Sequence, residues 1–319
     1  MCDLGVDVVG TWLEERIAQL CADLKRRDIR FCPHTWLSHD WFSPDGVPGI
    51  AIPFYLAHPR LMRLERRQIR EVEGGSRQEC MKILRHECGH AIQHAYQLQR
   101  RRRYQRLFGK SSQPYPESYR PNPASRRYVQ HLRFYYAQSH PDEDFAETFA
   151  VWLLPVATWR KRYQTWPALR KLEYVDELMS EIKHTRPLIS SRRQIDPVHS
   201  LKMRLRDYYA DKRERYDNGH TDIYDRDLLR LFSNNPESGN YLASKFLRCH
   251  RREIRALVGR DLGEHLFALE HVLDDMSGRC RELKLRAVSS ERTLLKNFAV
   301  LLTRKTALFL SHRSARIAL

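Results

Sequence analysis

The segment "RHECGHAIQHAY", residues 85–96, contains the pattern His-Glu-x-x-His at His86, Glu87 and His90. Side chains four residues apart lie on one face of a helix, so both histidines can present an imidazole to one metal ion. Glu87 directly follows the first histidine and can reach a water on that ion without binding the ion itself. The spacing therefore predicts a zinc site with a carboxylate base. The alternative is a partly exposed helix whose two histidines bind no metal.

A third protein ligand is needed, and the residues next to the motif do not supply it. A further glycine and histidine would mark the metzincin class of zinc peptidases, but Gln93 and Tyr96 occupy their positions, which excludes that class. His94 continues the four-residue ladder, yet an imidazole one turn further on reaches the same ion poorly. We expect His94 to lie at the surface or to support the site without binding the metal.

A second acidic segment, "HPDEDFAETFAVWL", places Glu143 and Glu147 one helical turn apart. One carboxylate of such a pair can bind the metal while the other accepts a hydrogen bond from a ligating histidine and fixes its tautomer. The alternative is an acidic first turn that complements the helix dipole. The two interpretations are compatible, because ligation and dipole stabilisation can use different residues.

The stretch from Tyr136 to Ala150, read as Y-A-x-x-H-P-x-E-D-F-A-E-T-x-A, resembles a bacterial family of zinc-binding metallopeptidases. More distantly, it is similar to the catalytic domain of anthrax lethal factor. Both look like gluzincins, in which an H-E-x-x-H helix precedes an E-x-x-A-E helix. The resemblance covers residues 80–155, extends over residues 30–185 and leaves out the C-terminal third. It implies a zincin-like fold that hydrolyses peptide bonds in a peptide or protein substrate.

Position by position, the resemblance implies that His86, His90 and Glu143 bind one Zn²⁺ ion per chain. It implies that Glu87 is the general base, which takes a proton from the attacking water and passes it to the leaving amine. It further implies that Glu147 is the carboxylate that holds a ligating histidine by a hydrogen bond.

The resemblance also implies a tyrosine that stabilises the oxyanion, at Tyr136, seven residues before Glu143. The adjacent Tyr135 remains an alternative for this role. The separation between His90 and Glu143 is long, and the Pro- and Ser-rich segment 109–125 can absorb it as a loop that covers the site.

The remaining sequence predicts the elements that position these residues. Apolar residues at helical spacing predict helices, and two segments rich in β-formers around a Pro-Asp-Gly turn predict strands. Because it contains Pro53, the second strand should be an edge strand, to which an extended peptide could pair. We expect helices at residues 10–27, 76–103, 125–138 and from about 141, and strands within residues 29–38 and 49–57.

The predicted fold class is α+β and predominantly helical. Residues 1–185 are expected to form a zincin-like catalytic domain with a small β-sheet. Residues 186–197, with two prolines and little periodicity, are expected to be a linker. Residues 198–319 are expected to form an all-α, basic accessory domain.

The composition predicts a globular chain with no membrane span. The 319 residues are 42% hydrophobic with a mean hydropathy of −0.64, and no apolar run is long enough to cross a bilayer. The N-terminal residues show no export signal. The seven scattered cysteines argue against a disulfide framework and favour a reducing compartment. We therefore expect a cytoplasmic protein.

The net charge of +17 predicts attraction to polyanions or to acidic partners. The run "QRRRRYQR", residues 99–106, is either a solvated helix end or an electrostatic patch. The function we expect is that of a zinc metallopeptidase. The alternatives are a nucleic-acid-associated zinc protease and a catalytically silent binding protein on a zincin fold. Silencing usually removes the base or a ligand, and Glu87 and the expected ligands are all present.

Overall fold

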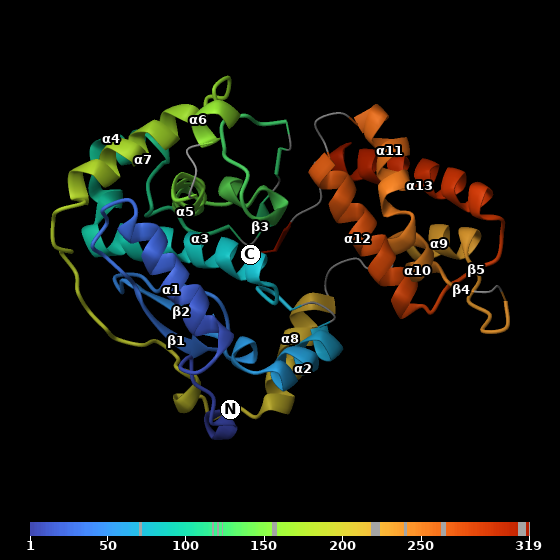
Figure 1. Ribbon diagram of the computed structural model, residues 1–319, viewed down its shortest axis with the longest axis horizontal. Helices are drawn as coiled ribbons and strands as arrows, with labels where there is room; N and C mark the ends of the chain where they lie inside the picture. Colours follow the sequence, from blue (N-terminus) through green and yellow to red (C-terminus); the bar gives the residue numbers. More distant parts are fainter. Residues whose placement is uncertain are drawn as a thin grey trace. The chain divides into compact units, whose positions relative to one another are not determined.

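The computed structural model describes residues 1–69, 72–116, 118–119, 121–122, 124–154, 158–217, 224–238, 241–262, 266–311 and 317–318. The chain divides into two compact units (Figure 1). The first unit comprises Met1–Arg215 and Arg316–Leu319, and the second comprises Tyr216–Ala315.

The first unit contains the elements that surround the candidate site. Its α-helices are α1 (Trp12–Lys25), α2 (Pro59–Ile69), α3 (Arg77–Tyr96), α4 (Arg102–Leu107), α5 (Pro141–Trp152), α6 (Thr158–Arg162), α7 (Leu169–Ile182) and α8 (Leu205–Asp217). Its short 3-10 helices are η1 (Cys2–Leu4), η2 (Phe54–Ala57), η3 (Leu98–Arg100), η4 (Arg133–Gln138) and η5 (Val198–Ser200). Its strands are β1 (His34–Ser38), β2 (Gly49–Pro53), β3 (Ser118–Tyr119) and β6 (Ile317–Ala318).

Helix α3 carries the His-Glu-x-x-His pattern through the middle of the first unit (Figure 1). The side chain of Ser76 accepts a hydrogen bond from Glu79 N and caps the first turn. The apolar residues that recur at helical spacing along α3 are fully buried: Leu84, Cys88, Ala91 and Ala95. The predicted helix is thus confirmed here. Helix α1 and strand β2 pack on α3, and so does α5. The motif therefore lies on a core helix that is rigidly held.

Helices α3 and α5 approach each other closely at Gly89. A Cβ atom built on Gly89 would lie 2.7 Å from Ala146 Cα, which is far inside van der Waals contact. The glycine between Glu87 and His90 therefore lets the second acidic segment reach the histidine pair. Pro141 begins α5, and the side chain of His140 accepts a hydrogen bond from Asp142 N as its N-cap.

Strands β1 and β2 form a parallel pair in which His34 lies opposite Gly49 and Ser38 lies opposite Pro53. Both predicted strands are confirmed. The expectation that β2 is an edge strand is wrong over its middle, because Phe42 pairs with Ala51 on the side away from β1. Phe42 O accepts a hydrogen bond from Ala51 N at 2.8 Å. The middle of β2 therefore has a neighbour on each side.

The helix expected at residues 125–138 does not form over the described part of that range. Residues 124–132 are irregular, and η4 follows at Arg133–Gln138. Inside η4, Phe134 and Tyr135 have φ of 60° and 57°, a left-handed conformation that costs free energy for such bulky side chains. Helical periodicity alone could not anticipate this turn, which directs the following residue toward α3.

The boundary between the units lies beyond the expected linker at residues 186–197. This segment runs along the first unit, where Leu188 N and Ile189 N donate to Ala95 O. Trp36 Nε1 of β1 donates to Ile195 O at 2.8 Å. Further on, Lys212 of α8 donates to the buried Glu65 of α2. Residues 186–197, whose composition is typical of a linker, are therefore held against the first unit by residues far away in the sequence, such as Trp36.

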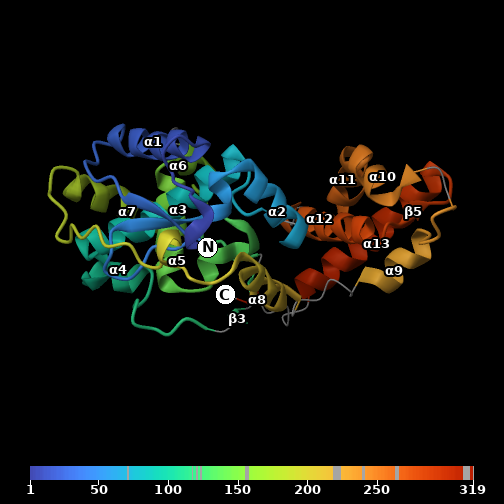
Figure 2. The ribbon, with the colours of Figure 1, turned by 90° about the horizontal axis from the view of Figure 1, so that it is seen from below.

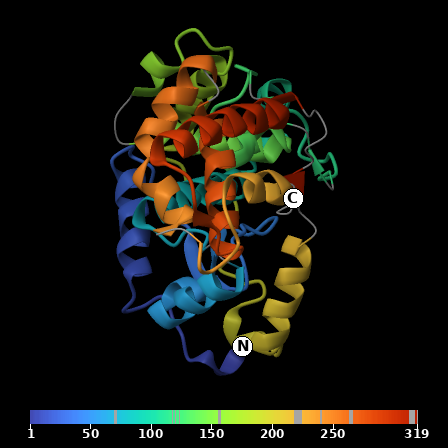
Figure 3. The ribbon, with the colours of Figure 1, turned by 90° about the vertical axis from the view of Figure 1, so that its right-hand side faces the viewer.

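The second unit is helical and has its own apolar core (Figures 2 and 3). Its helices are α9 (Asp225–Leu231), α10 (Ala243–Cys249), α11 (Arg251–Leu262), α12 (Leu266–Glu282) and α13 (Glu291–Ser311), and its strands are β4 (Tyr241–Leu242) and β5 (Arg286–Ala287). The expected all-α fold is therefore modified by one short antiparallel pair, β4 with β5. Leu257 on α11 is 47% exposed and lies outside this core.

Cys21 and Cys32 form a disulfide, whereas the cysteine pattern argued against a disulfide framework. Both cysteines flank the end of α1, where the chain turns back and brings their Cα atoms within 5.5 Å. The cross-link is therefore local. Within the described residues, no helix combines the length and the apolar composition that crossing a bilayer requires.

Candidate metal centre

Three buried side chains from α3 and α5 converge on one point: His86, His90 and Glu143. Glu143 Oε2 lies 2.9 Å from His86 Nε2 and 3.2 Å from His90 Nε2. The two Nε2 atoms lie 3.2 Å apart. Tetrahedral zinc with bonds of about 2.0–2.1 Å would hold its ligands about 3.3 Å apart. The three atoms thus have the spacing of one face of a zinc tetrahedron.

The charges of these groups fit a cation at their centre. Burial disfavours the charged form of His86, but hydrogen bonds and opposite charge from Glu143 and Glu147 outweigh burial and raise its pKa. Glu143 has its pKa lowered, because the charge of His90 and the hydrogen bonds with both histidines outweigh burial. These three side chains can bind either a proton or a metal ion, and the proton and the metal ion compete for the same lone pairs.

Glu147 fixes the orientation of His86. Its Oε1 lies 2.9 Å from His86 Nδ1, and its Oε2 accepts a hydrogen bond from Leu132 N at 2.9 Å. A carboxylate partner places the ring proton of His86 on Nδ1 and leaves the Nε2 lone pair for a metal. Glu147 is itself buried, so this contact is shielded from water.

Glu87 carries the unpaired carboxylate of the site. Its side chain is buried, and its Oε2 has no hydrogen-bond partner among the described residues. Burial raises the pKa of Glu87, the charges of His86 and His90 oppose that shift, and Asp40 adds to it. An orphaned buried carboxylate oxygen has a desolvation cost that a bound water would relieve.

Tyr136 of η4 lies over the site, with its ring centroid 5.6 Å from that of His86. Burial raises the pKa of Tyr136, and the negative charges of Glu143 and Glu87 raise it further. Its phenol therefore stays protonated beside both carboxylates. Tyr135 is buried, and burial raises its pKa to about 12. The ring contact with His86 thus belongs to Tyr136.

The site lies inside a segment that matches a known family. Residues 63–190 match the model of the family described as "Putative zinc-binding metallo-peptidase". This segment of the chain is similar to that family. The match confirms the resemblance seen in the sequence and includes α3, α5 and η4. Among curated proteins and solved structures, no significant match to the chain is found.

The matched segment brings a further tyrosine, Tyr115, to the site, which was not predicted from the sequence. The hydroxyl of Tyr115 donates to Glu143 Oε1 at 2.9 Å, and its ring stacks on His140 with centroids 3.8 Å apart. Glu143 is thereby left with Oε2 facing the histidines. The signal in the sequence was an aromatic residue between Pro114 and Pro116, inside the loop expected to cover the site.

A buried network around Asp142 anchors this loop. Asp142 Oδ1 accepts hydrogen bonds from Gln93 Nε2 at 2.8 Å, from Tyr104 OH at 3.3 Å and from the hydroxyl of Ser111. His140 Nε2 lies 2.9 Å from Gln113 O. Gln93, which stands where a metzincin has glycine, therefore ties α3 to α5 and to the loop.

His94 is buried and lies outside the group of converging ligand atoms. Its Nε2 lies 3.5 Å from Asp45 Oδ1. Burial lowers the pKa of His94, and the charge of His90 lowers it further. Of the two roles expected for His94, a surface position is wrong, and a supporting one remains a prediction.

Proposed function

We propose that this chain is a zinc-dependent peptidase that hydrolyses peptide bonds of a peptide or protein substrate. The observation that carries the proposal is the convergence of three metal-ligating atoms beside the orphaned Oε2 of Glu87. The match of residues 63–190 to a zinc-binding metallopeptidase family supports it. The assignment of His86, His90 and Glu143 as ligands of one Zn²⁺ per chain is part of the proposal.

Zinc held by these ligands would supply Lewis acidity, which polarises a carbonyl group and lowers the pKa of a water molecule. Glu87 would take a proton from the attacking water on its free Oε2 and carry it to the nitrogen of the leaving amine. The raised pKa of Glu87 suits both steps, because the carboxyl must accept the proton and then give it up.

The surrounding side chains would orient the metal ligands and stabilise the negative charge of the tetrahedral intermediate. Tyr136 would donate its phenolic hydrogen bond to the oxyanion of the tetrahedral intermediate. Glu147 would keep Nε2 of His86 free for the metal. Tyr115 would hold Glu143 so that a single oxygen faces the histidines.

An extended substrate has a place to pair along the residues around Phe42. Phe42 uses both its N–H and its C=O toward Ala51, so in antiparallel geometry the C=O groups of Trp41 and Ser43 face the other way. The segment around Phe42 lies near the site, since Asp45 Oδ1 lies 3.5 Å from Nε2 of His94, one helical turn beyond His90. Strand addition here would lay a peptide across the metal centre.

The test is hydrolysis of unfolded protein or mixed peptides by zinc-loaded full-length chain, with Glu87→Gln beside it. We expect Glu87→Gln to keep its zinc and to lose about a hundredfold or more of the activity. A matched variant, Glu173→Gln on the exposed side of α7, should retain activity. Equal activity in wild type and Glu87→Gln would contradict the proposal. Binding of peptides without cleavage by zinc-loaded wild type would instead favour a silent binding protein.

A further inference from the structure

The first unit carries most of the net positive charge of the chain. That unit holds 39 of the 56 lysines and arginines but 26 of the 39 acidic residues, an excess of 13. The most conspicuous run, at residues 99–106, is partly neutralised, because Arg101 pairs with Glu181 and Arg103 pairs with Glu177 of α7. The ion pairs on α7 thus weaken the interpretation of this run as an open electrostatic patch.

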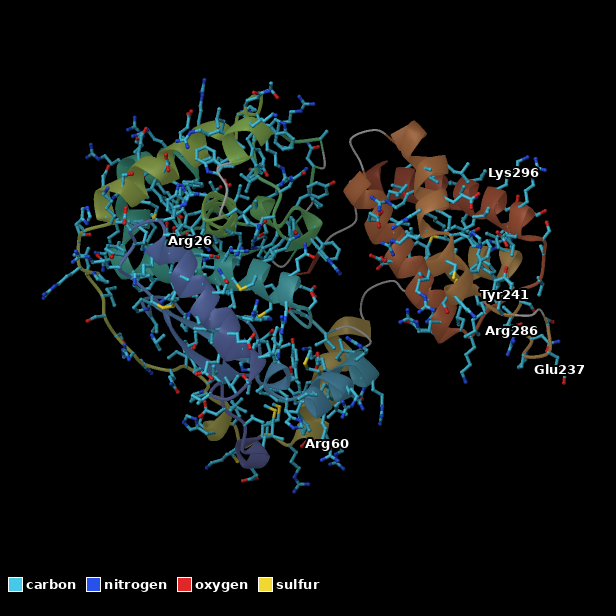
Figure 4. The ribbon with its side chains drawn as sticks, in the orientation of Figure 1. Arg26, Arg60, Glu237, Tyr241, Arg286 and Lys296 are labelled. Atoms are coloured by element: carbon cyan, nitrogen blue, oxygen red, sulfur yellow. A yellow bond between two sulfur atoms is a disulfide. The ribbon has the colours of Figure 1, made fainter. Side chains whose placement is uncertain are left out.

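The arginines of helix α2, unlike Arg101 and Arg103 in the run at residues 99–106, are not paired with carboxylates of a neighbouring helix that the structure describes. The four exposed arginines of α2 form no ion pair with any described residue: Arg60, Arg63, Arg66 and Arg67. The helix has one acidic residue, Glu65, which is buried and pairs with Lys212 at 2.9 Å on the inner side. Figure 4 places Arg60 at the periphery of this unit. Among the residues that the structure describes, no carboxylate pairs with the arginines on the outer face of α2.

The arginines are spaced to follow a line of charges. Arg60, Arg63 and Arg67 recur at intervals of three and four residues, so they share one side of α2 over about 10 Å. Together with Leu61 and Leu64 they line a shallow hollow. Guanidinium groups bind phosphate oxygens in a bidentate manner, which lysines do not. The surface thus matches a regular row of phosphates.

We propose that the outer face of α2 binds the phosphate backbone of double-stranded nucleic acid. Single strands are bound largely by stacking of bases on exposed aromatic rings. A bilayer would be met by exposed apolar side chains between the cations. Among the described residues, none of the exposed large hydrophobic side chains lies on α2, and Leu61 and Leu64 in the hollow are half-buried and pack against the core. Charge without stacking or inserting groups is typical of sequence-independent duplex binding.

The surface continues onto α8, which lies beside α2 (Figures 1 and 2). Arg213 of α8 is exposed and donates to Gln68 of α2. The contact between Lys212 and Glu65 fixes one helix against the other. A duplex on this face would therefore meet a preformed surface.

The experiment is fluorescence anisotropy of a labelled duplex of about 20 base pairs, titrated with full-length protein over a series of salt concentrations. The test variant is Arg60→Gln/Arg63→Gln/Arg67→Gln. The control variant, Arg101→Gln/Arg102→Gln/Arg103→Gln, removes the same charge from the run that pairs with α7. Unchanged melting temperature and zinc content would establish that both variants are folded.

We expect the α2 variant to bind duplex at least tenfold more weakly at about 100 mM salt, and its slope of log affinity against log salt to fall by about 2 to 3. The control should change affinity by less than about threefold. Equal losses of duplex affinity in both variants would overturn the proposal, because they would show that binding depends on net charge alone. Tighter binding of single strands, or binding only to phosphatidylserine vesicles, would also overturn it. Glu87→Gln should bind duplex like wild type, so this test is independent of the proposed hydrolysis.

Discussion

Gly89 of α3 and Ala146 of α5 are in direct contact, and a Cβ atom on Gly89 would lie 2.7 Å from Ala146 Cα. The two residues belong to the two motifs, since Gly89 precedes His90 and Ala146 precedes Glu147. The contact holds both helices at the separation that brings Glu143 to the histidines. The position of Glu143 in the candidate metal centre therefore depends on how closely α3 and α5 pack at Gly89.

Replacing Gly89 with alanine should force the two helices apart. The overlap involves α5 backbone, which cannot move aside as a side chain would, so we expect a loss of about 1–3 kcal/mol in the free energy of unfolding. Zinc affinity should fall as well, because Glu143 moves with α5. The checks are denaturant unfolding and competition with a chelator.

Gly278→Ala in α12 is the matched control for that substitution. Nothing lies within 4 Å of a Cβ atom at Gly278, so alanine should be neutral or stabilising by about 0.5–1 kcal/mol. A Gly89→Ala protein with wild-type stability and zinc affinity would show that the close approach of α3 and α5 does not set the site.

Glu147→Ala should weaken zinc binding without removing a ligand. His86 would lose the acceptor that fixes its tautomer, and the N–H of Leu132 would lose its partner. Loss of such a supporting carboxylate typically costs about 10–100-fold in metal affinity. Zinc dissociation constants measured by chelator competition test this, with Glu173→Ala on exposed α7 as the control. Identical constants in both variants would mean that Glu147 plays no part in holding the metal.

Tyr136→Phe should separate catalysis from metal binding. The variant keeps the ring against His86 but cannot donate to an oxyanion, so kcat/KM should fall by about 10²–10³ while zinc content is unchanged. Tyr135→Phe is the control, because the ring contact with His86 belongs to Tyr136. A larger loss in Tyr135→Phe than in Tyr136→Phe would reverse the assignment between the two neighbours.

Thiol alkylation tests the cysteine environments. Cys2 and Cys249 are exposed, while Cys80, Cys88 and Cys280 are buried and Cys21 bonds Cys32. Burial raises the pKa of Cys80 to about 12, which keeps this thiol protonated and unreactive. Intact mass after iodoacetamide should show labelling at the two exposed cysteines in native protein. Denaturation should expose the three buried thiols, and reduction should then add the last two. Labelling of Cys21 and Cys32 without reductant would contradict the disulfide.

The motifs could be predicted from the sequence because their chemistry depends on local spacing. Two histidines four residues apart lie on one helical face in any α-helix. Glu143 and Glu147 are also four residues apart and share a face for the same reason. The core position of α3 was equally visible, in the periodic apolar residues that the structure buries.

Other features depend on contacts between distant segments. The left-handed residues Phe134 and Tyr135 lie in a stretch with helical periodicity, and tertiary packing overrides that preference. Tyr115 reaches Glu143 through a loop whose course no local rule determines. Phe42 covers the middle of β2 in a way that the proline at the strand end did not reveal. The backbone of the expected linker at residues 186–197 is held by side chains of β1.

The central claim is that His86, His90 and Glu143 hold one zinc ion. The most direct measurement is zinc content by elemental analysis of wild type, Glu143→Ala and His94→Ala after loading and dialysis. We predict about one zinc per chain in wild type and in His94→Ala, and a sharp loss in Glu143→Ala. Little zinc in wild type, full zinc in Glu143→Ala, or a loss in His94→Ala equal to that in Glu143→Ala would contradict this ligand set.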